Sequence, residues 1–228
     1  MQIQGGNNMV VQHNLTAMNS NRMLGITVDS QAKSTEKLSS GYKINRAADD
    51  AAGLAISEKM RRQIRGLTQA SENAQDGISC VQTAEGALAE VHEMLQRMNE
   101  LAVQAANGTQ TSADRSYLNS EVEALIEEID RVADTTTFNE QNLLNGEFKD
   151  GKGLQVGAEA NQLITITIAA MDATTIGING VSVAEQADAQ SAITTIKDAL
   201  KKVSEQRSDL GAVQNRLEHT IANLDNVV

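Results

Sequence analysis

Apolar residues follow a regular spacing of three and four over the stretch from Leu67 to Ala105, and no polar residue interrupts the series. Its members are Leu67, Ala70, Ala74, Gly77, Val81, Ala84, Leu88, Val91, Leu95, Met98, Ala102 and Ala105. This spacing places the apolar side chains along one side of an α-helix and is typical of lateral packing between helices. We therefore predict a long helix over residues 44–106, with Leu88, Val91 and Leu95 in its buried seam.

A second series with the same spacing lies towards the C-terminal end, and only Arg207 and Gln214 among its members are polar. Its members are Ile193, Ile196, Leu200, Val203, Arg207, Leu210, Gln214, Leu217, Ile221, Leu224 and Val228. A shorter series lies between the two and consists of Leu118, Val122, Leu125, Ile129 and Val132. These patterns predict helices over 112–133 and 184–228, with Leu210 and Leu217 in the second seam. An antiparallel bundle would bury all three apolar faces.

The chain has no proline, which permits helices of unusual length because proline breaks helix interiors. Four glycines, Gly53, Gly66, Gly77 and Gly86, fall inside the longest predicted helix. Each costs about 1 kcal/mol relative to alanine, so we expect other helices to approach closely there.

Between residues 138 and 180 the residue pattern is no longer helical, because glycines flank short runs of the kind that form strands. The run from Leu163 to Ile168 alternates apolar and polar residues most clearly, as a half-buried strand does. We predict a small β-hairpin module within 138–180. The fold class is therefore mainly α, an elongated antiparallel bundle of long helices with a small β-hairpin module.

Composition excludes several classes of function. The net charge of −11 argues against nucleic acid as a partner, because phosphate binding needs a concentrated basic surface. The single Cys80 excludes an internal disulfide, and no Cys/His cluster has the spacing of metal ligands. The sequence contains no run of 18 apolar residues to cross a membrane, and no secretory signal peptide at its start. No pairing of a nucleophile with a base and no phosphate-binding loop is evident, so we expect neither catalysis nor a cofactor.

The first 42 residues differ from the rest. From Val10 to about Ser40 the sequence is polar and only weakly amphipathic. Such a segment does not hold a helix by itself. We expect residues 1–42 to be mobile in the monomer and to become helical on docking to other copies, whereas residues 43–228 form the packed core.

Two runs carry a resemblance to a known family. LSSGYKINRAADDAAGLAISEKM at Leu38–Met60 and RSDLGAVQNRLEHTIANL at Arg207–Leu224 resemble the paired core signatures of bacterial flagellin, the subunit of the flagellar filament. The resemblance implies an inner-tube segment at 1–42 and an outer core at 43–228, in a minimal form that lacks the variable domain and the C-terminal inner-tube helix. It implies a structural role in motility, with other flagellin subunits and the flagellar export machinery as partners. It also implies an extracellular place in the flagellum, reached without a cleaved signal peptide.

The same resemblance implies a second partner, the host flagellin-sensing Toll-like receptor. Matching the family motif to this sequence puts the receptor contact on Gln96, Arg97, Leu101 and Glu121. Arg97 and Glu121 would be polar anchors and Leu101 an apolar one. We expect these side chains to be exposed on neighbouring antiparallel helices.

Two alternatives stay open at this point. One is a hook–filament junction protein of the same superfamily, which shares the terminal helices. The other is a cytoplasmic coiled-coil adaptor, which the helix pattern alone also fits. Polymer formation by a chain extended at its C-terminus separates them, because an adaptor stops at a small oligomer.

Overall fold

The computed structural model describes residues 15–227, so predictions for residues 1–14 and for Val228 lie outside the described residues. The chain divides into two compact units at Arg62/Gln63. Its elements in order are α1 (Leu15–Ser40), α2 (Ala51–Ala105), α3 (Ser112–Thr135), β1 (Thr137–Phe138), β2 (Gln141–Asn142), β3 (Lys152–Gln155), β4 (Leu163–Ile166), α4 (Ala173–Ile176) and α5 (Gln186–Val227). The boundary between these units falls inside α2.

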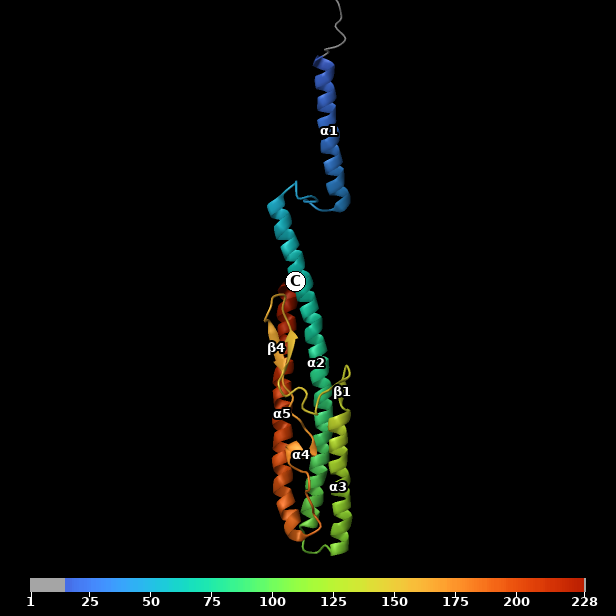
Figure 1. Ribbon diagram of the computed structural model, residues 1–228, viewed down its shortest axis with the longest axis vertical. Helices are drawn as coiled ribbons and strands as arrows, with labels where there is room; N and C mark the ends of the chain where they lie inside the picture. Colours follow the sequence, from blue (N-terminus) through green and yellow to red (C-terminus); the bar gives the residue numbers. More distant parts are fainter. Residues whose placement is uncertain (1–14, 228) are drawn as a thin grey trace, which may run out of the picture. The chain divides into compact units, whose positions relative to one another are not determined.

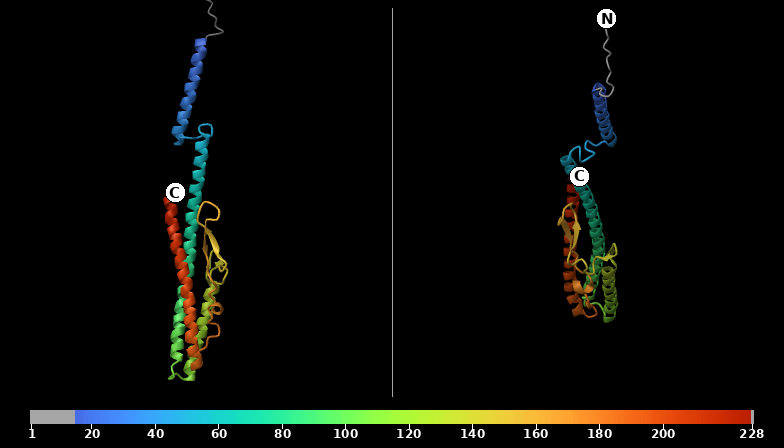
Figure 2. Two further views of the ribbon diagram at one scale, coloured as in Figure 1. Left: turned by 90° about the vertical axis from the view of Figure 1, so that its left-hand side faces the viewer. Right: turned by 45° about the horizontal axis from the view of Figure 1, so that its top comes forward.

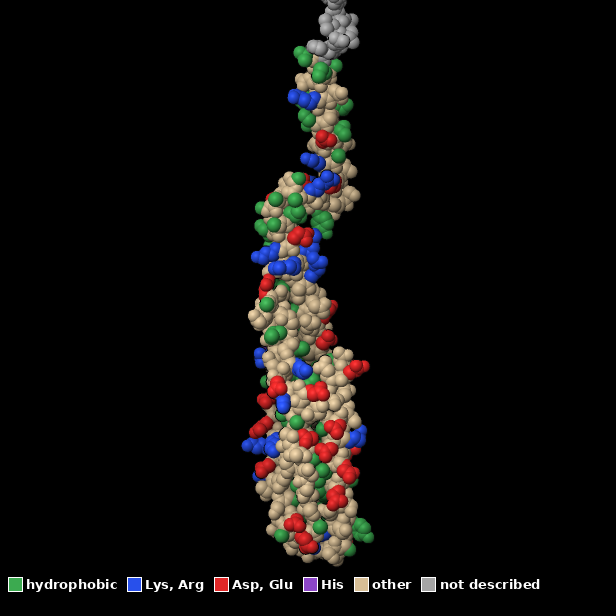
Figure 3. Space-filling view, in the orientation of Figure 1, with side chains coloured by type: hydrophobic (Ala, Val, Ile, Leu, Met, Phe, Trp, Pro, Cys, Tyr) green, Lys and Arg blue, Asp and Glu red, His purple; other side chains and the backbone are tan. Residues whose placement is uncertain are grey.

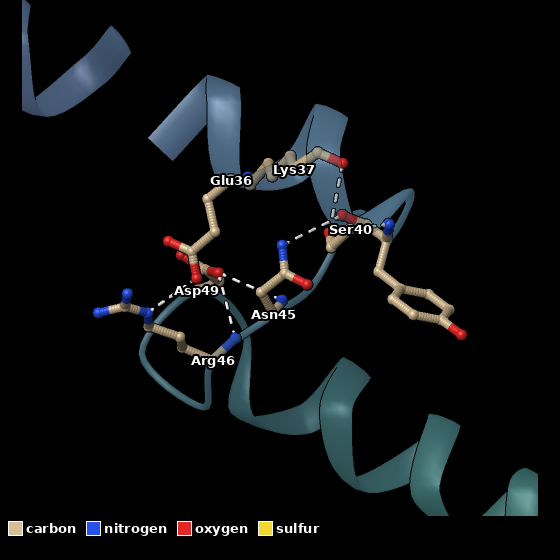
Figure 4. A network of polar contacts seen from close by, with 7 residues as sticks. Glu36, Lys37, Ser40, Asn45, Arg46 and Asp49 are labelled. Atoms are coloured by element: carbon tan, nitrogen blue, oxygen red, sulfur yellow. Dashed lines mark hydrogen bonds and ion pairs between the residues drawn. The ribbon is translucent and has the colours of Figure 1, made fainter. Parts of the chain in front are cut away.

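The first unit contains α1, the connection 41–50 and the first turns of α2. The predicted start of the long helix at residue 44 is wrong, because α2 begins at Ala51. Asp50 caps it, and its Oδ1 accepts a hydrogen bond from the backbone N–H of Gly53 at 2.9 Å. Asp49 folds the preceding turn by accepting from the N–H groups of Asn45 and Arg46 (Figure 4). Aspartate side chains that bond the local backbone in this way stop a helix from extending towards the N-terminus.

Figure 4 shows polar contacts at the end of α1 and in this turn. Arg46 Nε lies 3.0 Å from Glu36 Oε1 near the end of α1. The Ser40 hydroxyl donates to the carbonyl of Lys37 and accepts from the next-but-one backbone N–H. These groups are mostly exposed, and exposed ion pairs contribute little to stability. Weak polar bonds, and not the packing of apolar side chains in a core, therefore hold the connection 41–50 in place.

The second unit is a bundle in which α3 and α5 lie alongside α2 (Figures 1 and 2). The five seam positions expected from the sequence, Leu88, Val91, Leu95, Leu210 and Leu217, are fully buried. Contacts between residues far apart in sequence fix the antiparallel arrangement. Arg207 near the middle of α5 approaches Glu85 of α2 at 3.6 Å, and Gln186 at the start of α5 donates to the carbonyl of Ala106 just past the end of α2.

The buried face of α5 is rotated from the predicted seam. Leu210 and Leu217 lie in the core, but Ile193 and Leu200 are only half-buried. The buried set is Ala189, Ala192, Ile196, Ala199, Val203, Gln206, Leu210, Leu217 and Leu224. The reason is that α5 packs against the β region and α4 as well as against α2. Lys202, for example, donates to the carbonyls of Thr175 and Ile176.

The predicted single hairpin is replaced by two. Strands β1 and β2 pair antiparallel through Thr137 opposite Asn142, and β3 and β4 pair antiparallel through Lys152 opposite Ile166. The short helix α4 follows, with Asp172 as its N-cap. In β4 the alternation read from the sequence holds, since Ile164 and Ile166 are buried and Leu163 and Thr165 are exposed.

Gly77 of α2 lies where side chains of other elements approach the helix closely. A Cβ built on Gly77 would lie 2.2 Å from Leu154 Cδ1 of β3 and 3.4 Å from Leu217 Cδ1 of α5. The closest neighbour of Gly77 is therefore the β3–β4 hairpin, whereas the sequence had suggested another helix. The expectation is wrong at Gly86, where nothing lies within 4 Å of such a Cβ.

Candidate functional site

Three of the four residues proposed for receptor recognition lie on the exposed surface of α2 and α3. Gln96 and Arg97 are on α2, and Glu121 is on α3. The side chains of Arg97 and Glu121 are 50% and 44% exposed. The two helices are joined by a short turn, and α3 starts with a capping box in which Thr111 and Asp114 bond each other's backbone N–H. This turn fixes how residues near 97 and 121 come together.

Arg97 is held by two carboxylates. Its Nε donates to Glu121 Oε1 across the helices at 2.8 Å, and its Nη1 donates to Glu100 Oε2 at 3.1 Å along α2. The hydrogen bond that Arg97 donates to Glu121 is the largest cause that raises the pKa of Arg97, followed by the one that it donates to Glu100. Arginine is always charged, and the two hydrogen bonds set the direction of its guanidinium before any partner arrives.

Gln96 is tied to the preceding turn of α2. Its Nε2 lies 2.9 Å from His92 Nε2, so the amide N–H₂ donates and that ring nitrogen accepts. His92 Nδ1 is buried and has no hydrogen-bond partner within the part of the chain that the structure describes. Gln96 itself is exposed. It can therefore exchange its contact with His92 for one with a partner at small cost.

Leu101 is not part of this surface, and the expectation that it is exposed is wrong. It is 1% exposed and belongs to the main hydrophobic core. Arg97 lies one turn earlier and reaches α3, and side chains four apart share a helix face. Leu101 is thus turned towards α3. The sequence argument allowed α2 one seam, whereas α2 packs against both α5 and α3 and buries a wider arc.

Sequence reasoning missed three polar residues that hold the bundle in shape. Arg115 of α3 donates to the carbonyls of Ala105 and Asn107 and so closes the end of α2. Asn119 accepts hydrogen bonds from the Ser182 hydroxyl and the backbone N–H of Val183. Buried Gln206 is the third. The only sequence signal for such residues is a polar residue within an apolar series. Gln206 gave no such signal, because the C-terminal series contains its neighbour Arg207 instead.

A different surface lies on the first unit, where apolar side chains have no cover. None of the described residues of α1 is buried. The large exposed apolar residues there are Leu15, Met18, Met23, Leu24, Ile26, Val28, Leu38, Tyr42, Ile56 and Met60. Green side chains on this part of the surface are visible in Figure 3. Exposed apolar sets of this kind mark sites of protein association.

Charge divides between the two units. Residues 1–62 contain eight basic and five acidic residues, a net charge of +3, and residues 63–228 contain eleven basic and 25 acidic residues, a net charge of −14. Opposite charges on different parts of one chain favour contacts between copies.

The described part of the chain shows neither a metal site nor a membrane-spanning helix. Residues 15–227 contain no group of three or more His, Cys, Asp or Glu side chains placed to hold a metal ion. Within the same residues, no helix combines the length and apolarity that a membrane crossing requires. Cys80 is buried, and burial raises the pKa of its thiol.

Comparison with known proteins agrees with this architecture. The bacterial flagellin N-terminal helical region matches residues 11–149, and the bacterial flagellin C-terminal helical region matches residues 193–228. A flagellin of Halalkalibacterium halodurans is 56% identical over 220 residues, which are 96% of this chain and 80% of that protein.

Solved structures with a similar fold include a flagellin and a flagellar hook-associated protein. The crystal structure of Bacillus cereus flagellin has a TM-score of 0.59 and 30% identity, and the match covers 67% of this chain and 88% of that one. A putative flagellar hook-associated protein from Vibrio parahaemolyticus has a TM-score of 0.67 at 17% identity, covering 79% of this chain and 95% of that one, which shows a shared fold alone. On the family match and the high identity to a flagellin, this chain belongs to the bacterial flagellin family.

Proposed function

We propose that this protein is a structural subunit that polymerises with other copies into the bacterial flagellar filament and serves motility. Family membership supports a structural protein and not an enzyme. The observation that carries the proposal is the first unit, in which the 26-residue helix α1 buries none of its residues. A helix of this length gains most of its stability from packing, and neighbouring copies would bury its exposed apolar side chains.

A filament outside the cell requires export, and we assign it to the flagellar export machinery without a cleaved signal peptide. The support is membership of the bacterial flagellin family.

Electron microscopy of the chain after addition of flagellar filament seeds tests the filament proposal. The probe is a chimera in which this chain replaces the matching 220 residues of the Halalkalibacterium halodurans flagellin, so that the part of that protein beyond the matched 80% is kept. Filaments longer than the seeds support the assignment. A species that stays a small oligomer at all concentrations contradicts it and favours an adaptor. Growth only as a short cap on the seeds favours the hook–filament junction role.

A second role rests on the surface of α2 and α3. We infer that Gln96, Arg97 and Glu121 contact the host flagellin-sensing Toll-like receptor, whereas Leu101 supports this surface from the core. The exposed, preset guanidinium of Arg97 supports the proposal, since arginine is enriched among residues that dominate binding energy. Immobilised receptor ectodomain binds the protein if the assignment holds, and R97A weakens that binding. Equal affinity of R97A and the parent chain contradicts it.

A further inference from the structure

Asparagine followed by glycine occurs at three exposed turns of the second unit, at Asn107, Asn145 and Asn179. This dipeptide is chemically labile, because glycine has no side chain to shield its backbone nitrogen from the neighbouring asparagine amide. The three sites share the same dipeptide, so differences among them come from the fold.

We propose that Asn145 is a site of spontaneous, structure-directed deamidation, and that the fold makes it react ahead of Asn179. The Gly146 nitrogen loses its proton to a base in solution and bonds to Cγ of Asn145. The Cγ–Nδ2 bond breaks, and the amide nitrogen leaves as ammonia. Water then opens the cyclic imide at one of its two carbonyls, which leaves either an aspartate or an isoaspartate in place of the asparagine. No oxidant or reductant takes part.

Two hydrogen bonds to Glu147 restrict the Asn145 side chain to one orientation beside the Gly146 peptide. The backbone N–H of Glu147 donates to Asn145 Oδ1 at 3.0 Å, and Asn145 Nδ2 donates to Glu147 Oε1 at 3.2 Å. A backbone N–H can only donate, so the amide oxygen is the atom that it contacts. The amide is thereby folded back over the peptide group of Gly146, which lies between the two bonded residues.

The bond from Glu147 N–H also stabilises the reaction itself. When the Gly146 nitrogen attacks Cγ, negative charge develops on Oδ1, and a hydrogen-bond donor already aimed at that oxygen lowers the barrier. Asn107 has the same local bond, from the N–H of Thr109, but at 3.3 Å. Its activation is therefore weaker.

Asn179 provides a control within the same molecule. No described hydrogen bond reaches its Oδ1, and its Nδ2 donates instead to Thr174 Oγ1 at 3.3 Å, which directs the amide back towards α4. Its own backbone N–H is fixed on the carbonyl of Ala173. Asn179 and Gly180 are both exposed, so access of water does not distinguish this site from Asn145.

The modification changes the electrostatics of its turn. The product replaces the N–H₂ donor that bonds Glu147 with a carboxylate, and two like charges then face each other. The turn lies next to Leu143 and Leu144, which are fully buried, so repulsion there acts on a segment anchored in the core.

The test incubates the folded 228-residue chain in mildly alkaline buffer, digests it in acid and measures the three asparagine-containing peptides by mass spectrometry. Isoaspartate-specific methyl labelling identifies the rearranged product. We expect Asn145 to react about tenfold faster than Asn179, which corresponds to about 1.4 kcal/mol in the barrier. Equal rates at Asn145 and Asn179, or a faster reaction at Asn179, overturn the proposal.

Denaturation and two matched variants separate fold from sequence. In concentrated urea the rates at Asn145 and Asn179 should approach each other, because the hydrogen bonds that distinguish them are lost. A difference that persists unchanged in urea assigns the effect to local sequence and contradicts the proposal. N145Q should abolish modification at that turn because the longer side chain must close a larger ring, while N179Q should leave the rate at Asn145 unchanged. A changed rate at Asn145 in N179Q contradicts independent control by the Glu147 bond.

Discussion

Arg97 of α2 and Glu121 of α3 form an ion pair across the two helices, with 2.8 Å between Nε and Oε1. The pair joins two of the residues proposed for receptor recognition before any receptor is present. A partner must therefore accept the pair as a unit or replace Glu121 with its own acceptor. Either route makes the orientation of the guanidinium part of the recognition.

Replacing Arg97 by alanine should weaken receptor binding while the melting temperature changes little. The side chain is half exposed and its ion pairs face solvent, where such pairs contribute little to stability. Binding to immobilised receptor and thermal unfolding followed by circular dichroism measure the two effects. E121Q is the matched variant, since it keeps the shape of the partner and removes its charge. A large loss of fold stability in R97A would show that the residue acts in the bundle and not at a partner surface.

Replacing Leu101 by alanine should destabilise the second unit by about 2–5 kcal/mol, because it removes a fully buried side chain and leaves a cavity. Val103 on the same helix is 53% exposed, so V103A should change the free energy of unfolding by less than about 0.5 kcal/mol. Urea denaturation of both variants measures the difference. Similar small effects from the two substitutions would place Leu101 on the surface after all.

Replacing Gln206 by alanine should destabilise the protein by about 1–3 kcal/mol, since it leaves partly buried backbone groups of Thr167 and Ala169 without their side-chain partner. Its Oε1 accepts from the N–H of Ala169 and its Nε2 donates to the carbonyl of Thr167, both at 3.1 Å. The neighbouring exposed Glu205 is a suitable control, and E205A should stay within about 0.5 kcal/mol of the parent chain. Chemical denaturation at neutral pH compares them. Equal stability of Q206A and E205A would contradict the role given to this amide.

Acid should loosen the start of α3. Hydrogen bonds from the hydroxyl and backbone N–H of Thr111 lower the pKa of Asp114 below its ordinary value. A depressed pKa in the folded state means that the ionised carboxylate stabilises the fold above the pKa of the unfolded chain. That contribution is lost as pH falls through the folded value. Carboxyl chemical shifts in an acid titration locate the transition. In D114N, the protection of α3 against hydrogen exchange should fall less on acidification than in the parent chain. An identical acid dependence in D114N and the parent chain would refute this assignment.

Helix α1 should exchange its backbone hydrogens rapidly in dilute solution, because none of its described residues is buried. Hydrogen exchange measured by mass spectrometry should show weak protection over residues 15–26 and strong protection over the buried seam of α2. Protection of 15–26 should rise on polymerisation, when other copies cover the helix. Strong protection in the dilute monomer would contradict the prediction that this segment is mobile alone.

The sequence by itself determined the helices and much of their packing, since periodic apolar residues indicate which side of a helix is buried. The positions Leu88, Leu95 and Leu210 could be identified because a spacing of three and four has one geometric meaning on a helix. Specific runs such as Leu38–Met60 also carried the family resemblance. Both signals are local, and each can be read without knowing what lies opposite.

Only the tertiary structure decided features that depend on more than one partner. Leu101 is buried because α2 packs against α3 as well as α5, and a periodic pattern does not tell how many neighbours a helix has. Gln206 enters the core because the loop at Thr167–Ala169 needs a donor and an acceptor. Asp49 and Asp50 accept hydrogen bonds from nearby backbone N–H groups, and α2 therefore starts at Ala51 and not at residue 44. In each case the residue satisfies groups that are distant in sequence or compete with the helix, and only the folded chain brings these groups together.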